Sequence, residues 1–335
     1  MSFRRVCETI RDNAFVTSTL PVIVSLEVHS SREQQEIMVE IMDECFKGLL
    51  VDFDRADGAK LPSPKDLSKK ILIKVKYSPP TTSDEATQVA AGTLSKTQTQ
   101  SSRSGDDEAV PPKDGAKAKP SKIIEALSRF GIYTKSYSFK SLDQPEAAIP
   151  AHVFSLSESA LIEVHKENPA DLFDHNKRFF MRAYPKGTRV SSSNLDPTLF
   201  WRKGVQMVAL NWQKCDAGVM LSEGMFANTG GWVLKPENYR ATAEYSDNGA
   251  SHGSWFNIEF LAGQNIDPPK DVDAADFHPF IKCELHAVVP GKWEDKEDMF
   301  KAKTKAAKGR NPDFKRQVVK FEKIPCIEPE LTFVR

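Results

Sequence analysis

Charged and hydroxyl side chains recur at every second position near the ends of several apolar runs in this 335-residue chain. Side chains two apart along a strand point to the same side, so each such pair is expected on one side of its strand. Lysine offers a point charge, arginine a two-pronged donor and tyrosine a flat ring, a set that suits a multiply phosphorylated ligand. The candidate binding residues are Lys74, Lys76, Ser155, Arg182 and Tyr184.

Glu27 is a carboxylate inside an otherwise apolar run, 21–28. A carboxylate that is buried among apolar side chains needs a partner. Glu27 is therefore a candidate catalytic or metal-ligating group, and the pattern alone leaves a structural role equally open. A lysine at a strand end is likewise often only a solvated charge.

The segments that carry these residues alternate between strands and helices. Ser30 with Glu33 and Ser31 with Gln34 each offer a capping box before one helix, and two short helices are predicted to break at Asn168 and Pro169. This alternation predicts an α/β sheet or barrel of parallel strands, whose sites form at the strands' carboxyl ends. The predicted strands are Pro21–Val28, Ile71–Lys76, His152–Leu156, Phe179–Tyr184 and Val205–Trp212.

Composition divides the chain into segments. Residues 79–122 contain no aromatic side chain and few large aliphatic ones, so burial cannot offset their ordering entropy and they are predicted to be a disordered linker. Residues 1–78 and 123–240 flank it as α/β pieces. From Trp255 onward strands follow one another without helices, which predicts a separate all-β module over 250–335.

Charge and cysteine usage exclude several classes. The 46 Lys and Arg balance 46 Asp and Glu, which excludes a globally basic nucleic-acid binder. The five cysteines are widely spaced without a CxxC pair, so free thiols are expected rather than a disulfide framework or structural zinc. The sequence has neither an apolar run of transmembrane length nor a signal-peptide core, so a cytoplasmic protein is expected.

Several motifs carry a family resemblance. PVIVSLEVHSSREQQEIM and LPSPKDLSKKILIKVK resemble the end of the X region of eukaryotic phosphoinositide-specific phospholipase C, and YPKGTRVSSSN and WRKGVQMVALN resemble its Y region. Residues 79–122 then take the place of the X–Y linker, and 255–335 resemble the first half of a C2 domain. The resemblance implies an incomplete TIM-type barrel, about its last five strands, followed by a partial C2-type sandwich.

The resemblance also implies residue roles. Glu27 matches a calcium ligand near the reacting hydroxyl, Lys74 and Lys76 match the pair that contacts ring phosphates, Ser155 and Arg182 match the residues that hold the 4-phosphate, and Tyr184 matches the tyrosine that packs on the inositol ring. The implied reaction is calcium-dependent hydrolysis of phosphatidylinositol 4,5-bisphosphate to inositol trisphosphate and diacylglycerol at a membrane surface. The implied partners are a phosphoinositide lipid and a peripheral membrane surface, with protein partners left open.

One feature argues against activity. None of the seven histidines lies in a context that matches the family's acid and base histidines, so the chain alone is expected to be inactive. The alternatives are a non-catalytic lipid- or partner-binding fragment and an incomplete gene model.

Thr188 replaces a bulky apolar residue of the membrane-facing rim, and the basic run 301–316 either attracts anionic lipid or is a solvated loop.

Overall fold

The computed structural model describes residues 1–52, 60–78, 123–241, 254–273, 276–287, 299–324 and 327–335. The predicted linker, 79–122, and nearly all of the polar boundary near 241–252 lie outside the described residues. The described chain forms two compact units. The first comprises Met1–Leu195, Val205–Asp216 and Met225–Val233, and the second comprises Asp196–Gly204, Ala217–Gly224 and Leu234–Arg335.

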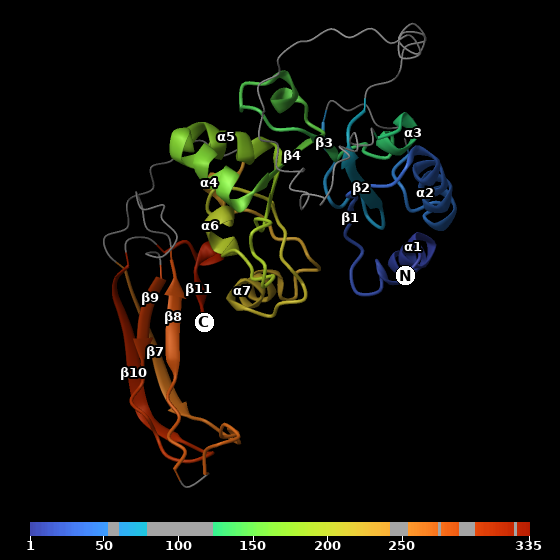
Figure 1. The fold of residues 1–335 in the computed structure, drawn as a ribbon. Helices are drawn as coiled ribbons and strands as arrows, with labels where there is room; N and C mark the ends of the chain where they lie inside the picture. Colours follow the sequence, from blue (N-terminus) through green and yellow to red (C-terminus); the bar gives the residue numbers. More distant parts are fainter. Residues whose placement is uncertain (53–59, 79–122, 242–253, 274–275, 288–298, 325–326) are drawn as a thin grey trace, which may run out of the picture. The chain divides into compact units, whose positions relative to one another are not determined.

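The first unit is built on a curved sheet of six parallel strands in the order β1-β2-β3-β4-β5-β6 (Figure 1). The strands are β1 (Val22–Ser25), β2 (Ile71–Lys76), β3 (Lys135–Tyr137), β4 (His152–Ser157), β5 (Phe180–Tyr184) and β6 (Met207–Val208). Five of them fall within or nearly on the predicted runs. The sequence KSY of β3 has no apolar run, which is why this strand was not predicted.

Helices cover one face of this sheet. They are α1 (Phe3–Asn13), α2 (Arg32–Cys45), α3 (Glu125–Ser128), α4 (Glu158–Glu167) and α5 (Pro169–Arg178). Helix α7 (Ala217–Phe226) follows β6 in the sequence, and most of it belongs to the second unit. Of the two capping boxes that the sequence offered, the one that begins α2 is Ser31 with Gln34: Ser31 Oγ accepts from the Gln34 N–H at 3.3 Å, and Gln34 Oε1 accepts from the Ser31 N–H at 3.1 Å. Met42 packs with Ile71 and Ile73 in a core shared by α1, α2 and β2.

The prediction of a strand buried on both faces over 21–28 was wrong. β1 covers only Val22–Ser25, and its side chains are partly or fully exposed. Among the described strands β1 pairs only with β2. It is therefore an edge strand, and no described strand pairs with its other edge. The carbonyl of Pro21, just before β1, accepts a hydrogen bond from the indole of Trp232 at 2.9 Å.

The second unit contains two antiparallel sheets. Strand β10 (Asp313–Ile324) pairs with β7 (Ser254–Ala262), and β8 (Lys282–His286) lies between β11 (Phe333–Val334) and β9 (Met299–Lys303). The sheets share an apolar core. Its buried members are Cys283, Leu285, Ala287, Val319, Phe321 and Ile324. This confirms that β sheets follow the parallel half-barrel.

Helix α6 (Pro197–Trp201) belongs to this second unit, although its sequence precedes the predicted β module. Asp196 Oδ2 lies 3.5 Å from Nδ1 of His286, and Arg202 Nη2 donates to the carbonyl of Leu331 at 3.2 Å. The Trp201 and Phe333 rings have centroids 5.6 Å apart. These contacts, across many residues of sequence, explain why α6 groups with β8 and β11.

The described residues also form 3-10 helices at Pro145–Ala148, Glu237–Tyr239 and Pro329–Leu331. No helix in the described ranges is long and apolar enough to cross a bilayer.

Candidate functional site

The strand register places the candidate binding residues on one face of the parallel sheet. Lys76 pairs with Ser136, Ser136 pairs with Val153, and Ser155, two residues further along β4, pairs with Arg182. Paired residues of neighbouring strands point to the same side of a sheet. We call this side the inner face, and it carries Lys74, Lys76, Ser136, Ser155, Arg182 and Tyr184.

Along each strand the inner face changes from apolar to polar. On β2, Leu72 precedes Lys74, and on β4 the buried Val153 precedes Ser155. The polar side chains therefore gather toward the carboxyl ends of parallel strands. This is the edge at which parallel α/β folds place their binding and catalytic groups.

Lys74 is held inside the sheet, whereas Lys76 reaches solvent. The Lys74 side chain is buried, and its ammonium donates to the Ser136 hydroxyl at 3.2 Å. A buried ammonium needs such acceptors, and β3 supplies this one. Ser136 is thus a site residue that the sequence did not reveal, because its strand has no apolar signature.

Ser155 and Arg182 lie side by side at the centre of the inner face. The Ser155 residue is only 8 % exposed, and its Oγ has no hydrogen-bond partner in the part of the chain that the structure describes. The half-buried Arg182 places its guanidinium carbon 5.2 Å from the centre of the Tyr184 ring, which is a cation–π contact. The geometry thus sets a hydroxyl, a guanidinium and an aromatic ring together.

Glu27 does not occupy the environment that the sequence predicted. It follows the end of β1 and is exposed, so burial does not force a partner on it, and that argument for its function was wrong. Calcium takes six to eight oxygen ligands. Within the described ranges no three His, Cys, Asp or Glu side chains gather into a metal-binding group, so Glu27 and its described neighbours do not form a complete calcium site.

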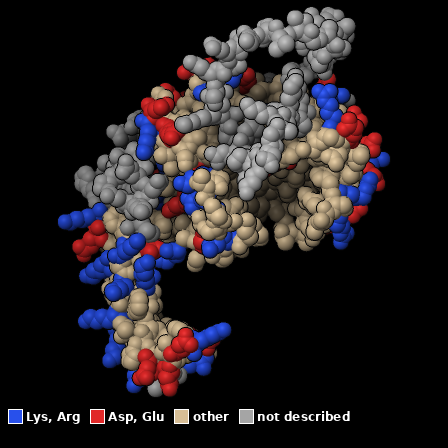
Figure 2. All heavy atoms as spheres, in the orientation of Figure 1, with Lys and Arg blue, Asp and Glu red and all other residues tan. Residues whose placement is uncertain are grey.

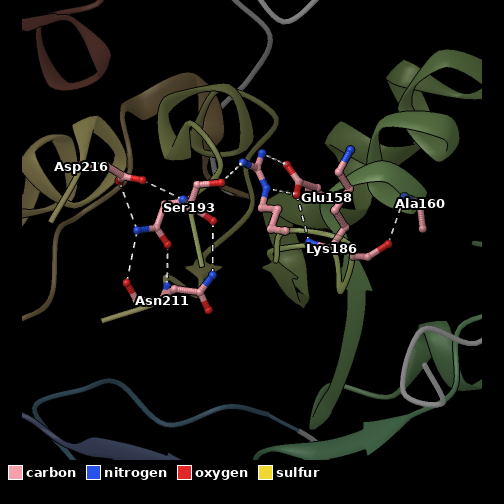
Figure 3. A network of polar contacts seen from close by, with 9 residues as sticks. Glu158, Ala160, Lys186, Ser193, Asn211 and Asp216 are labelled. Carbon is pink, nitrogen blue, oxygen red and sulfur yellow. Dashed lines mark hydrogen bonds and ion pairs between the residues drawn. The ribbon is translucent and has the colours of Figure 1, made fainter. Parts of the chain in front are cut away.

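An ion pair joins the start of α4, directly after β4, to the loop that follows β5 (Figure 3). The buried Glu158 begins α4, and Arg189 donates to its Oε1 from Nε at 2.5 Å and to its Oε2 from Nη2 at 2.6 Å. The Lys186 N–H donates to the same Oε1 at 2.9 Å. Burial alone would raise the pKa of Glu158, but the hydrogen bonds from Arg189 and Lys186 outweigh it and lower the pKa.

A second network, around Asn194, fixes the loop after β6. The Asn194 N–H donates to Asp216 Oδ2 at 2.8 Å, and its Nδ2 donates to Asp216 Oδ1 at 3.1 Å. The Asn211 N–H donates to Asn194 Oδ1 at 2.5 Å. Ser193 joins the two networks, because its Oγ accepts from Arg189 and its carbonyl accepts from Asn211 (Figure 3).

From the sequence alone, the YPKGTRVSSSN run indicates the family but no structural role. The structure shows that its Arg189, Ser193 and Asn194 tie together the loops at the carboxyl ends of β4, β5 and β6. A glutamate at the first position of a helix was a visible signal for the N-terminal end of α4. Its partner, 31 residues away, had no local signal.

Two histidines of the first unit form a buried pair on the opposite face of β4. His152 Nε2 lies 3.0 Å from His175 Nε2, and His152 Nδ1 lies 2.6 Å from the carbonyl of Ile149. Burial lowers the pKa of His152 to about 4, with His175 adding to the effect. Because Phe154, two residues on, stacks on His175, this pair belongs to the helix-covered side of the sheet and not to the inner face.

Two apolar side chains stand on the loops that these networks fix. Val190 is 95 % exposed in the loop after β5, and Trp212 is 79 % exposed in the loop after β6. Thr188, two residues before Val190, is exposed as well.

Comparison with known families agrees with this geometry. The family model for the phosphatidylinositol-specific phospholipase C X domain matches residues 1–77, and that for the Y domain matches residues 127–238. A 1-phosphatidylinositol 4,5-bisphosphate phosphodiesterase of Candida albicans is 32 % identical over 333 residues, covering 89 % of this chain and 30 % of the relative. The delta-3-A phosphodiesterase of Danio rerio is 34 % identical, covering 85 % of this chain and 38 % of that protein.

One similar protein is named as inactive. The inactive phospholipase C-like protein 2 of Homo sapiens is 31 % identical, covering 85 % of this chain and 26 % of that protein. The chain therefore spans roughly a quarter to two fifths of the length of these relatives.

Solved structures show the same fold. The crystal structure of S. officinalis PLC21 is similar with a TM-score of 0.73 and 28 % identity, covering 99 % of this chain and 41 % of that one. L. pealei PLC21 gives 0.75 and 29 %, covering 100 % and 41 %. The parallel half-barrel is thus an incomplete TIM-type barrel, and the chain belongs to the phosphoinositide-specific phospholipase C family.

Proposed function

We propose that the inner face binds the phosphorylated inositol headgroup of phosphatidylinositol 4,5-bisphosphate. The observation that carries the proposal is the register, which sets Ser155 beside Arg182 and brings Lys76 onto the same face. The unpartnered, buried Ser155 hydroxyl supports it further. A buried hydroxyl without a partner costs free energy that a bound phosphate oxygen would recover.

Each residue has a separate task in this proposal. Arg182 presents two N–H groups to one phosphate, and Ser155 donates its hydroxyl to the same group. Lys76 contributes a charge at the solvent end, whereas the buried Lys74 adds a positive charge behind it. Tyr184 keeps the guanidinium oriented through its ring and offers that ring to the inositol.

The loops around the face supply the approach to the lipid. Val190 and Trp212 are exposed apolar side chains on loops next to the carboxyl ends of β5 and β6. Such side chains can enter the interfacial region of a bilayer while the headgroup occupies the inner face. The substrate would then be taken from a membrane surface.

The second candidate function is binding without turnover, and the described histidines favour it for the chain by itself. His152 and His175 lie on the helix-covered side, and no described imidazole is hydrogen-bonded to Ser155 or Arg182. Acid and base groups each contribute on the order of 10² to 10⁴ in rate. Calcium-dependent hydrolysis of the lipid would need oxygen ligands for the ion beyond Glu27.

Calorimetry with the full chain tests the proposal. Inositol trisphosphate is expected to bind, and unphosphorylated inositol is expected to bind at least tenfold more weakly, because it lacks the groups that Arg182 and Ser155 recognise. Equal affinities for inositol trisphosphate and inositol would show that the inner face does not recognise phosphate groups. A parallel assay on phosphatidylinositol 4,5-bisphosphate with calcium separates the two candidates: turnover typical of an intact phosphodiesterase would reject binding without turnover.

A further inference from the structure

The hydrogen bonds between β1 and β2 identify which edge of β1 has no neighbour. The Val22 N–H donates to the carbonyl of Lys70 at 3.0 Å, so the backbone groups of Val22 point toward β2. The backbone groups of successive residues in a strand point to opposite edges, so those of Ile23 and Ser25 point away from β2. No described strand pairs with this side of β1, which we call the free edge.

Strand β1 has little protection of its own at the free edge. Its sequence, VIVS, contains no charged side chain. On the face seen in Figure 2, the charged side chains of this part of the molecule lie over α1 and α2 instead. An unpaired edge can template pairing with another chain unless charge, proline, a short strand or a covering segment prevents it. The shortness of β1 and the missing N–H of Pro21 give part of that protection.

A distant segment of the first unit returns to the free edge. The indole Nε1 of Trp232 donates to the carbonyl of Pro21 at 2.9 Å, across 211 residues of sequence. Pro21 lies two residues before Ile23, so its carbonyl points to the same edge as the backbone groups of Ile23. The indole therefore occupies the first hydrogen-bond acceptor of the free edge.

Residues 228–232 have a backbone that is shaped for this return, and we call them the clasp. Asn228, Gly230 and Gly231 have φ angles of +60°, +67° and +86°, in the left-handed region that glycine and asparagine tolerate best. Thr229 closes the turn, because its hydroxyl accepts from the Gly231 N–H at 3.3 Å. Three left-handed residues within four positions bend the chain tightly just before Trp232.

Gly230 brings the clasp into close contact with the chain that precedes β1. A Cβ atom added at Gly230 would lie 2.6 Å from Ser18 Oγ and 3.1 Å from Ser18 Cβ, which is too close for non-bonded atoms. The Ser18 hydroxyl is itself held in place, because it accepts from the Leu20 N–H at 3.2 Å. A Cβ at the neighbouring Gly231 would meet nothing within 4 Å. The clasp thus has a second point of contact, three residues before Pro21.

We propose that the clasp guards the free edge of β1 and prevents edge-to-edge pairing with β1 of a second copy of this chain. A strand added to the free edge would use the Pro21 carbonyl and the space beside Ser18, and the clasp occupies both. Closure of the clasp and addition of a strand therefore exclude one another. Because β1 precedes residues 79–122 and the clasp follows them, the guard forms only when the two flanking segments have packed together.

Sedimentation velocity of the full chain, with all variants at one protein concentration, tests this proposal. Trp232→Phe keeps an aromatic ring but removes the donor, and Gly230→Ala introduces a Cβ for which the contact leaves no room. The control for the first is Trp255→Phe, because Trp255 is 71 % exposed on β7. The control for the second is Gly231→Ala, which imposes the same left-handed strain where a Cβ has space.

The wild type and both controls should sediment as monomers, whereas both clasp variants should associate. Loss of the indole hydrogen bond should raise the population with an open clasp, and with it the dimer association constant, roughly 3- to 10-fold. Adding Ser25→Pro to Trp232→Phe should restore the monomer, because proline removes the N–H of residue 25 at the free edge. Circular dichroism melting verifies that each variant is folded, and the comparison of Gly230→Ala with Gly231→Ala does not depend on the tryptophan variant.

Three outcomes would overturn the proposal. The first is a wild type that associates as strongly as Trp232→Phe, which would show that the clasp leaves the edge open. The second is that the two clasp variants stay as monomeric as their controls. The third is unchanged association of Trp232→Phe after Ser25→Pro is added, which would place the contact between copies on another surface.

Discussion

Arg189 donates two parallel hydrogen bonds to Glu158, from Nε at 2.5 Å and from Nη2 at 2.6 Å, across 31 residues of sequence. This fork joins the first turn of α4, which directly follows β4, to the loop after β5 at the polar edge of the sheet. Ser155 lies three residues before Glu158 on β4, and Tyr184 lies five residues before Arg189. The ion pair therefore positions the strand ends that carry the candidate site.

Arg189→Met is expected to lower the free energy of unfolding by about 3 kcal/mol, because it leaves the buried carboxylate of Glu158 without its cation. The double variant with Glu158→Gln should recover part of that loss. Chemical denaturation measures both. The control is Arg178→Met, which breaks an exposed pair with Asp174 and should cost at most about 1 kcal/mol. Equal losses for Arg189→Met and Arg178→Met would contradict the role of the fork.

Asn194→Asp replaces a donor with a carboxylate oxygen beside Asp216 Oδ1, which lies 3.1 Å from the present Nδ2. We expect a loss of about 2 to 3 kcal/mol of unfolding free energy near neutral pH, since a hydrogen bond to a charged group becomes a repulsion. The loss should shrink as acid protonates the new carboxylate. Asn13→Asp, at an exposed helix end, is the control. A pH-independent loss would show that charge repulsion is not its cause.

The candidate site was predictable where its signal was local. Period-two spacing put Lys74 and Lys76 on one side of β2, and the parallel register then brought Ser155 and Arg182 together on the same face. Ser136 was not predictable, because β3 is three residues long and has no apolar pattern. Its contact with Lys74 comes from sheet pairing, which no local propensity encodes.

The failures also have physical reasons. Glu27 looked buried because its neighbours in sequence are apolar, but an edge strand leaves such residues open to solvent. The His152–His175 pair and the assignment of α6 to the second unit depend on contacts between distant segments. The start of α2 was predictable, because its cap depends only on Ser31 and Gln34, which are three residues apart.

Ser155→Ala should separate stability from binding. The Ser155 hydroxyl is buried and has no partner in the described ranges, so its removal should leave the free energy of unfolding unchanged or raise it by up to about 1 kcal/mol. Inositol trisphosphate affinity should fall. Ser136→Ala is the matched comparison, because it removes an acceptor of the buried Lys74 and should destabilise the chain by about 1 to 3 kcal/mol. If Ser155→Ala binds inositol trisphosphate as tightly as the wild type does, the Ser155 hydroxyl does not contact the ligand.

His152 makes stability depend on pH in a defined window. Burial lowers its pKa to about 4, whereas the unfolded chain keeps the ordinary value near 6.5. Between these values the unfolded state binds a proton that the folded state does not, so stability is full above pH 6.5 and falls as the pH drops toward 4. The contribution amounts to about 3 kcal/mol at most.

Denaturation curves at several pH values measure this effect. His152→Phe keeps an aromatic ring among Phe154 and Phe179 but cannot titrate, so its unfolding free energy should fall less steeply between pH 6.5 and 4 than that of the wild type. Parallel slopes for the two proteins would show that His152 is protonated in the folded chain.

Titration of inositol trisphosphate into Arg182→Met tests the phosphate-binding inner face most directly. The side chain keeps its apolar stem but loses both donors, so the affinity should fall roughly 10- to 100-fold, as expected for a charge-assisted hydrogen bond. Arg178→Met, which removes an exposed guanidinium from α5, should bind as the wild type does. If Arg182→Met binds inositol trisphosphate as tightly as Arg178→Met does, the inner face is not the headgroup site.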